Sequence, residues 1–569
     1  MRGLPWKIPD AMALILLERR MEVEMKVEMN VAGAVCCAVL ALCFGGCGKA
    51  DGGRVLSTTA YPARGRLLDC KGQALAMNGR SFKFYLDPKG IRMGKEEAAR
   101  AIAAALDLDA GDVLRKCNDE KSRYVFLAKC EGEETVEKLR DRGFGIQIQE
   151  TRVRKIEDPK LAGLLGEVGS APGDERLMKG RSGFEYVHDE CLRGVVATNQ
   201  VVVGPDGTEQ RALTWNKPKN GCDVMLTIDR VVQSALQDVL EKFADTNDTG
   251  RAWGVVMEVK TGAIRAIAET CSAMLSTNDN GQVAASCFHY EAGSVLKPFT
   301  VAIALDCGLA KIDTPYSTAR DDEHYHKLPS DWGHVWPATL SIGEAMVKSS
   351  NIVLGKLSYD LGPERLYLGL RSFGFGEKPD SGLGLESPGV LRDCRKIPWG
   401  KVERSRIGIG QGLSVTVLQL ARGYAILANG GVDVRPYTVE KIVDPAGTVK
   451  FQHCHTATNR VVGAEAAAMV CRALERVVSD QGTARRAAVE GVHVAGKTGT
   501  AQRRDGRDGL KYSAEQYMSS FAGFFPAECP EYVICVAFET KKIGGSFMHQ
   551  GGYRPALAFA ELVKAMRRR

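Results

Sequence analysis

The sequence predicts a mixed α/β protein of the α+β type, with an amino-terminal module followed by a larger carboxy-terminal domain. In the first part, strand-like runs at 82–86, 124–128 and 144–148 alternate with helical stretches, which is typical of an α+β module. A short linker rich in Lys, Pro and Asn follows near 214–220. From about residue 221 to the end, mixed strands and helices are numerous enough to bury a core of their own.

Composition excludes several classes of function. The 569 residues carry a mild formal net charge of +7 spread along the chain, which favours neither nucleic acid as a partner nor strong lipid affinity. No nucleic-acid partner is therefore expected. Nine histidines form no ligand constellation, and the nearest group, His453-Cys454-His455, is more typical of a surface cluster than of a metal site. Seventeen cysteines lack a repeated spacing, which favours buried thiols over a disulfide framework. Cys529 and Cys535, which flank an apparent strand, are the first pair to examine.

Near the amino terminus, one long uncharged apolar run covers 31–44. It is short for a membrane span, which needs about 20 residues. Three interpretations compete for it: a slightly short signal-anchor, a cleaved signal peptide, or a lipoprotein signal with Phe44-Gly-Gly-Cys47 as an imperfect lipobox. The flanking charges do not decide the orientation, and later methionines leave the true start open.

Ser294 and Lys297 stand three positions apart at the start of an apolar segment, 294–305. On a helix, such positions share one face within side-chain reach. Pro298 is tolerated only in the first turn, which places the serine at or near the helix start, where peptide dipoles favour a developing alkoxide. A plain helix cap and a solvated lysine are the alternatives when this pair is taken alone.

A lysine can act as the base for this serine only if its pKa is lowered, since an ordinary lysine is protonated at neutral pH. Burial and a second cation both lower the pKa of a lysine. A drop of roughly three units corresponds to about 4 kcal/mol, which an enclosed site can supply. Lys497 is the natural second cation for Lys297.

Two downstream motifs complete the pattern of a serine acyl-transfer site. Ser349-Ser350-Asn351 lies between two apolar helical patterns, where three consecutive polar residues suggest a functional role. A buried serine that caps a helix is the alternative for Ser349. Lys497-Thr498-Gly499-Thr500 follows an alternating stretch, 492–495, that is suited to a strand. The order serine-lysine pair, Ser-x-Asn, Lys-Thr-Gly is the trio of penicillin-interacting enzymes.

Earlier copies of these short motifs are better explained by structure. Lys260-Thr261-Gly262 separates two apolar runs, 253–259 and 263–268, and we expect a hairpin turn closed by its glycine. Ser276-Thr277-Asn278 lies among turn formers and is interpreted as a polar loop.

The three motifs together resemble those of penicillin-binding proteins, the serine D,D-transpeptidases that cross-link peptidoglycan. The resemblance runs from about residue 60 to the end and includes Gly221–Asp229, 410–412, Phe521–Pro526 and Gly551-Gly552. It implies a transpeptidase (penicillin-binding) domain at 221–569, similar in fold to β-lactamases, with a central antiparallel sheet flanked by helices.

The upstream sequence resembles the class B, monofunctional members. Arg64–Gly72 is similar to the signature that begins their non-catalytic pedestal, and Gly180–Glu185 before Leu192-Arg-Gly194 is similar to a second one, whereas Glu150-Thr-Arg152 departs from the family. The resemblance implies a pedestal, or dimerisation-like, domain at 54–213, and it favours a transmembrane signal-anchor at 31–47 after a cytoplasmic tail at 1–30. The catalytic domain would then be periplasmic, on a single-pass protein of the cytoplasmic membrane.

The family's roles transfer to matching positions as expectations. Ser294 would attack the penultimate D-alanine carbonyl of a stem peptide while Lys297 takes its proton, and Ser349 would relay a proton to the leaving D-alanine. The substrate would be bound by a second group: Asn351, Lys497, Thr498, Gly499 and Thr500, with the backbone amides of Ser294 and Thr500 forming the oxyanion hole. No metal or organic cofactor is implied.

The resemblance also implies binding partners for the protein and a particular branch of the family. Peptidoglycan stem peptides, lipid-linked or on nascent glycan, would be substrates and β-lactams would be inhibitors, with residual D,D-carboxypeptidase activity possible. A membrane glycosyltransferase and divisome proteins would be partners. The runs at 419–431 and 521–527 favour the division-type, septal branch. An elongation-type transpeptidase, a β-lactamase or β-lactam sensor, and a catalytically silent scaffold remain alternatives.

Overall fold

The computed structural model describes residues 54–119, 121, 124–203, 209–244, 250–270, 284–325, 327–331, 334–454, 459–505, 511–542 and 550–568. The expected tail, the apolar run and the Ser276-Thr277-Asn278 copy lie outside these ranges. Within them, no helix combines the length and the apolar character that crossing a membrane requires. The chain divides into two compact units, Met1–Thr59 with Thr198–Asn216, and Ala60–Ala197 with Lys217–Arg569.

The first unit contains a three-stranded sheet in the order β1-β8-β9. Its strands are β1 (Arg54–Ala60), β8 (Ala197–Val203) and β9 (Glu209–Thr214). β8 and β9 pair antiparallel, with Gln200 opposite Thr214. The Asn199 side chain accepts a hydrogen bond from the Asn216 backbone N–H at 2.6 Å, which closes the open end of the hairpin.

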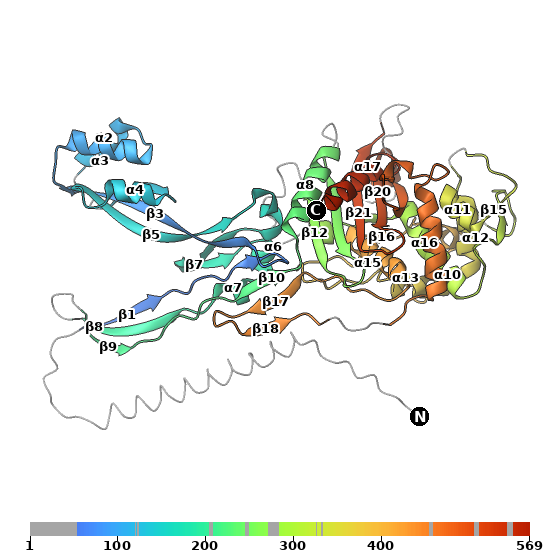
Figure 1. Ribbon diagram of the computed structural model, residues 1–569, viewed down its shortest axis with the longest axis horizontal. Coiled ribbons are helices and arrows are strands. Elements are labelled where there is room, and N and C mark those ends of the chain that lie inside the picture. The colour runs from blue at the N-terminus through green and yellow to red at the C-terminus, as the bar shows by residue number, and fades with distance from the viewer. Residues whose placement is uncertain are drawn as a thin grey trace, which may run out of the picture. The chain divides into compact units, whose positions relative to one another are not determined.

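In the second unit, two long strands form an arm, visible at the left of Figure 1. β3 (Ala74–Ile91) pairs antiparallel with β5 (Phe144–Ile156) and with β4 (Val125–Cys130). Alternate β3 side chains, Phe82, Phe84 and Leu86, face a small core made with three helices. These helices are α2 (Lys95–Leu106), α3 (Ala110–Asn118) and α4 (Glu133–Leu139). The predicted α+β module is confirmed, with strands longer than their apolar runs indicate.

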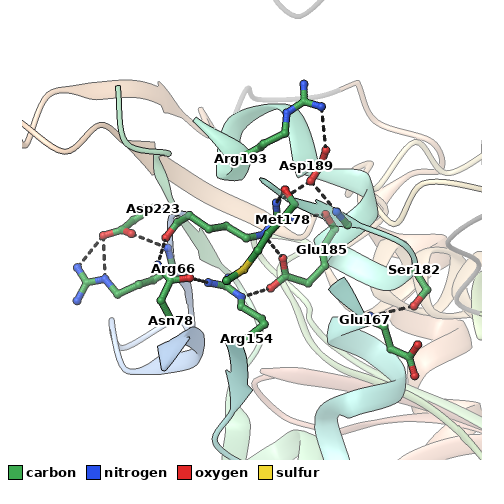
Figure 2. Close-up of polar contacts among 12 residues, drawn as sticks. Arg66, Asn78, Arg154, Glu167, Met178, Ser182, Glu185, Asp189, Arg193 and Asp223 are labelled. Atoms are coloured by element: carbon green, nitrogen blue, oxygen red, sulfur yellow. Dashed lines mark hydrogen bonds and ion pairs between the residues drawn. The ribbon is translucent and has the colours of Figure 1, made fainter. Parts of the chain in front are cut away.

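A buried ion cluster joins the segments that resemble the pedestal signatures (Figure 2). Arg64 contacts Glu185 at 2.7 Å and Asp189 at 2.6 Å, and Arg154 contacts Glu185 at 2.6 Å from the arm strand β5. The Glu185 side chain is fully buried and those of Arg64 and Arg154 nearly so. Since a buried charge is tolerated only when it is paired, each member of the cluster requires the others.

A second sheet runs from the arm into the carboxy-terminal part, in the order β18-β17-β10-β2-β3-β4. Its further strands are β2 (Leu67–Leu68), β10 (Asp223–Leu226), β17 (Val439–Val443) and β18 (Val449–Gln452). β10 pairs parallel with β2 and antiparallel with β17. The hydrogen bond from Gly65 N to Leu192 O, 2.8 Å long, fixes the start of β2 beside the second signature.

A five-stranded sheet in the order β12-β11-β21-β20-β19 forms the centre of the carboxy-terminal part. Its strands are β11 (Ala252–Glu258), β12 (Ile264–Thr270), β19 (Ala495–Asp505), β20 (Lys511–Phe525) and β21 (Tyr532–Lys541). Every neighbouring pair is antiparallel, as expected. The turn between β11 and β12 is closed by Gly262 at φ +81°, which confirms that the first Lys-Thr-Gly copy is a hairpin turn.

Helices cover both faces of this sheet. On β21, Val533, Cys535 and Ala537 belong to one core and the intervening Ile534, Val536 and Phe538 to the other, because successive strand residues face opposite sides. The second core contains α8 (Arg230–Phe243) and α17 (Arg554–Arg567), which lie together in Figure 1. Cys535 is therefore buried inside a strand rather than beside one, and the exposed Cys529 forms no disulfide with it.

The other core is built with further helices. They are α10 (Lys297–Asp306), α11 (Ile342–Lys348), α12 (Asn351–Leu361), α13 (Pro363–Ser372), α15 (Val417–Ala428) and α16 (Ala464–Val478). Of these, α10 begins at Lys297 and α12 begins at Asn351. The remaining α-helices and β-strands of four or more residues are α5 (Ala162–Leu165), β6 (Val168–Ala171), β7 (Asp174–Gly180), α6 (Gly183–Val187), α7 (Asp189–Arg193), α9 (Ala284–Cys287) and α14 (Lys401–Ile407). Short bridges pair β13 (Tyr290–Glu291) with β16 (Ser414–Val415) and β14 (Pro315–Ser317) with β15 (Thr339–Ser341).

The buried ion cluster predicts unequal effects for one substitution made at two arginines. Arg154→Met leaves the buried Glu185 with one cation fewer, and we expect it to lower the free energy of unfolding by about 3 kcal/mol. Arg66→Met removes an exposed pair with Asp223, and we expect a loss below about 1 kcal/mol. Urea unfolding followed by far-ultraviolet circular dichroism compares them. Equal, small losses would show that the cluster does not stabilise the arm.

Candidate active site

Ser294 lies in a 3₁₀ turn, η2 (Gly293–Leu296), that continues directly into α10. Pro298 occupies the first turn of α10, so the serine stands at the helix start as predicted, although one 3₁₀ turn earlier than a helix cap. Gly293 has φ +58°, and a Cβ there would come within 3.1 Å of Thr500 O. The absent side chain lets this turn pack against β19. Ser294 is partly exposed between buried neighbours.

Lys297 is fully buried, and three oxygen atoms surround its ammonium nitrogen. Nζ donates to Ser349 O at 2.7 Å, to Asn351 Oδ1 at 2.7 Å and to Ser349 Oγ at 3.2 Å. Burial lowers the pKa of Lys297 from 10.5 to about 7, because the charged form loses its hydration, while the negative charge of Asp331 acts in the opposite direction. The sequence predicts a lowered pKa, and the structure agrees.

The Ser349-Ser350-Asn351 motif occupies the junction between two helices. Ser349 ends α11 in the left-handed conformation, at φ +60°, which is uncommon for a residue with a side chain. Ser350 caps α12, accepting a hydrogen bond from Val353 N at 3.2 Å. The helix-capping role considered for Ser349 is therefore performed by Ser350. The sharp turn directs both the carbonyl and the hydroxyl of Ser349 to Lys297.

Lys497, on β19, is the second buried lysine and contacts the same hydroxyl. Its Nζ donates to Ser349 Oγ at 2.9 Å and to Thr498 O at 3.1 Å. Burial lowers its pKa, and the positive charge of Lys297 lowers it further. The predicted pairing of two cations is therefore present, with Ser349 Oγ between them. Because two like charges in a dry site oppose one another, the arrangement favours a neutral amine on one of them.

Asp331, which the sequence did not single out, holds the start of α12. Its carboxylate accepts hydrogen bonds from Ser350 Oγ at 2.7 Å, from Ile352 N at 3.1 Å and from Asn351 N. Trp336 Nε1 donates to the same group at 2.9 Å. An acidic residue twenty positions before a helix carries no local signal for this role, because only the path of the intervening loop brings it there.

The rest of the Lys497-Thr498-Gly499-Thr500 motif lines β19 beside the serine. Thr498 shares a 3.0 Å hydrogen bond with Thr483, and Thr500 Oγ1 accepts from Gly551 N at 3.0 Å. A Cβ on Gly499 would meet Val295 at 2.9 Å and Ser520 Oγ at 2.4 Å, so a glycine is needed where η2 rests on the strand. Three predicted motifs from separate elements thus form one site.

This arrangement is suited to acyl transfer by a hydroxyl. A partly exposed serine precedes a buried lysine of lowered pKa, a second hydroxyl bridges two amines, and the strand beside them supplies a cation and threonine hydroxyls. Among the described residues, no three His, Cys, Asp or Glu side chains gather as metal ligands would.

Comparisons with known proteins match both parts of the chain. The family described as "Penicillin binding protein transpeptidase domain" matches residues 252–564, and "Penicillin-binding Protein dimerisation domain" matches residues 59–226. The chain is 31% identical over 462 residues to penicillin-binding protein PbpB of Mycolicibacterium smegmatis, covering 78% of this chain and 69% of that protein. It is 31% identical over 404 residues to the probable peptidoglycan D,D-transpeptidase PenA of Neisseria flavescens, covering 68% and 93%.

Among solved structures, the chain is similar to the crystal structure of a peptidoglycan synthetase from Bifidobacterium adolescentis, with a TM-score of 0.68. The sequence identity is 24%, over 90% of this chain and 96% of that one. At this identity, the likeness supports the fold alone.

The surroundings of Lys297 predict a titration near neutral pH. We expect Lys297 to change charge at a pH of about 7, in an NMR titration of lysine labelled with ¹³C at Cε in which its signal is assigned with Lys297→Met. Asp331→Asn removes a negative charge that favours the ammonium, so the titration should move to lower pH. Asp313→Asn, on an exposed loop residue, is the control and should leave it unchanged. A Lys297 signal that titrates above pH 9 in the wild type would contradict the buried site.

Proposed function

Because the chain belongs to the class B penicillin-binding proteins, we propose that it cross-links peptidoglycan stem peptides through an acyl-enzyme formed on Ser294. Membership makes it a penicillin-binding D,D-transpeptidase, and the proposal concerns the residues, the intermediate and the cellular role. One observation carries it above all: Lys297 and Lys497 are both buried and both donate to the hydroxyl of Ser349.

The first step is activation of the nucleophile. With a pKa of about 7, Lys297 is neutral in a large fraction of molecules at neutral pH and accepts the proton of Ser294. The serine oxygen then bonds to the penultimate D-alanine carbonyl carbon of the donor peptide. The backbone amides of Ser294 and Thr500 stabilise the oxyanion, an effect often worth a few kcal/mol.

Collapse of this intermediate requires a proton on the leaving group. The C–N bond to the terminal D-alanine breaks, and its amine takes a proton that travels from Lys297 through the Ser349 hydroxyl, which lies 3.2 Å from Nζ. The amine of a second stem peptide then attacks the ester and gives up a proton by the reverse path. A new amide bond forms, the ester C–O bond breaks, and the Ser294 oxygen takes this proton back from Lys297.

Substrate binding uses the groups on the opposite side of Ser349. Within the part of the chain that the structure describes, Lys497 forms no ion pair, and the terminal carboxylate of the donor supplies the counter-charge, so its arrival raises the pKa of Lys497 and secures the positive charge when it is needed. Thr498, Gly499 and Thr500 align the peptide along β19, and Asn351 binds a substrate amide while it orients Lys297.

For the cellular role, we favour septal synthesis during division. The support is sequence likeness in 419–431 and 521–527 to division-type members, while an elongation role is the alternative. We place the transpeptidase domain outside the cytoplasm, anchored by 31–47, with a membrane glycosyltransferase and divisome proteins as partners. The domain limits proposed remain 54–213 for the pedestal and 221–569 for the transpeptidase.

The acyl-enzyme predicts a long-lived adduct on one serine. A fluorescent penicillin should label the wild-type protein, peptide mapping should locate the label on Ser294, and Ser294→Ala should abolish labelling without loss of folding, as judged by circular dichroism. Decay of the adduct over minutes or longer supports a transpeptidase. Turnover within seconds would instead indicate a β-lactamase, and a label on another residue would refute the proposed site.

The septal role predicts a specific morphology on depletion. Cells that lose the protein should grow into filaments with failed septa, observed by microscopy, and a wild-type copy should restore division. A Ser294→Ala copy should not restore it, because the acyl-enzyme cannot form. Rounded cells would assign the protein to elongation, and rescue by Ser294→Ala would indicate a scaffold without catalysis.

A further inference from the structure

The small sheet of the arm has one face that helices cover and one that they leave open. Phe82, Phe84 and Leu86 of β3 face the helices α2, α3 and α4, so the residues between them face the other way. Each of these β3 residues, Lys83 and Tyr85, lies opposite one residue of β4 and one residue of β5. The open face is defined here by two rows of three residues: Phe126, Tyr85 and Gln147 in one row, and Lys129, Lys83 and Gln149 in the other.

Aromatic rings occupy one row of this open face. Phe126 is 50% exposed and meets Tyr85 edge-on, with ring centroids 5.7 Å apart. Tyr124, 54% exposed, stacks on Tyr85 at 4.3 Å. Such pairs stabilise an edge strand, but that benefit does not require the outer ring faces to stay in water. Burying these rings would stabilise the protein by about 25 cal/mol for each Å² of apolar surface. Because the rings stay exposed instead, we interpret this face as a binding surface.

Lysines occupy the second row. Lys83 and Lys129 are directly opposite across β3 and β4, an arrangement in which like charges destabilise a sheet. Among the described residues, neither forms an ion pair. Lys116, on α3 of the covered face, donates to Phe126 O at 3.2 Å and so adds no amine to the open face. A ligand with negative charge would relieve this repulsion, so the charge of the face is complementary to an anion.

The two glutamines and the dimensions of the open face restrict the chemical class of the ligand further. Gln147 and Gln149 are exposed and extend the rows onto β5 with amides that donate and accept hydrogen bonds. Strands lie about 4.8 Å apart and same-face neighbours about 7 Å apart, so the two rows cover roughly 10 by 7 Å. This is a flat, narrow platform of rings, amides and amines, which suits a short stretch of a polysaccharide.

We propose that this open face binds a carboxylate-bearing glycan strand, namely the nascent, uncross-linked strand whose stem peptides the catalytic site joins. Apolar faces of the sugar rings would pack on Tyr85 and Phe126, acetamido and hydroxyl groups would bond to the glutamines, and stem-peptide carboxylates would meet Lys83 and Lys129. The identity of the polymer rests on the proposed function. The binding surface itself rests on the arm alone.

A protein partner fits the face less well. Stable interfaces bury about 800 Å² on each side, with a continuous apolar centre. Phe126 and Tyr124 are about half exposed and Tyr85 is partly buried, so the rings offer roughly 250 Å² of apolar surface at most, since a whole aromatic side chain buries 150–250 Å². Amines and amides make up the remainder. Weak binding repeated along a polymer needs no larger patch.

Binding to soluble glycan strands tests the proposal. The full-length protein is first acylated with penicillin, so that the catalytic site is blocked, and is then titrated with uncross-linked peptidoglycan strands that carry stem peptides. We expect the double variant Tyr85→Ala/Phe126→Ala to weaken binding at least tenfold. Lys83→Gln/Lys129→Gln should weaken binding to these strands severalfold, yet leave binding to uncharged N-acetylglucosamine oligomers unchanged.

Controls separate this proposal from the proposed function. Tyr186→Ala removes another exposed tyrosine, 45% exposed, and should bind the strands as the wild type does. All variants should react with penicillin at the wild-type rate, which establishes folding and an intact catalytic site. Wild-type affinity in the Tyr85→Ala/Phe126→Ala variant, or no binding by the wild type, would overturn the glycan surface. Failure of the wild type to react with penicillin would overturn the proposed function instead.

Discussion

The catalytic part of this molecule depends on burying two lysine amines around one serine hydroxyl. A buried ammonium is costly, so Lys297 and Lys497 are tolerated only because backbone and side-chain oxygens surround them and because their pKa values fall. The same desolvation cost makes the site reactive, because a buried ammonium lowers its free energy either by losing a proton or by pairing with a substrate carboxylate. The burial of these two amines therefore determines both the hydrogen bonds that hold the site together and its ability to exchange protons.

Holding that arrangement requires rigid neighbours on each side. Asp331 fixes the first turn of α12 and thereby Asn351, while the left-handed Ser349 turns its carbonyl and hydroxyl inward. On the strand side, Gly499 lets η2 rest directly against β19. The central sheet, buried on both faces, provides the fixed reference for these contacts. The reactive groups therefore lie on packed elements rather than on loops, which limits their movement.

The arm repeats this principle without catalysis. Arg64, Arg154 and Glu185 come from segments far apart in the sequence, and each is buried only because the others neutralise it. Their mutual dependence ties the start of the second sheet to the long β3 and β5 strands. At the far end of those strands, β3 alternates buried and partly buried residues over 82–88, which leaves one face of the small sheet for rings and amines.

The sequence by itself determined the α+β character, the hairpin at Gly262 and the three motifs, because periodicity, turn residues and short spacings are local properties of a chain. It also indicated which Lys-Thr-Gly copy belongs on a strand. The tertiary structure alone decided that both lysines share Ser349 Oγ, that Asp331 holds α12 and that Cys535 is buried inside β21. Those facts depend on where distant segments pack, and long-range packing leaves no periodic trace in the residues that it brings together.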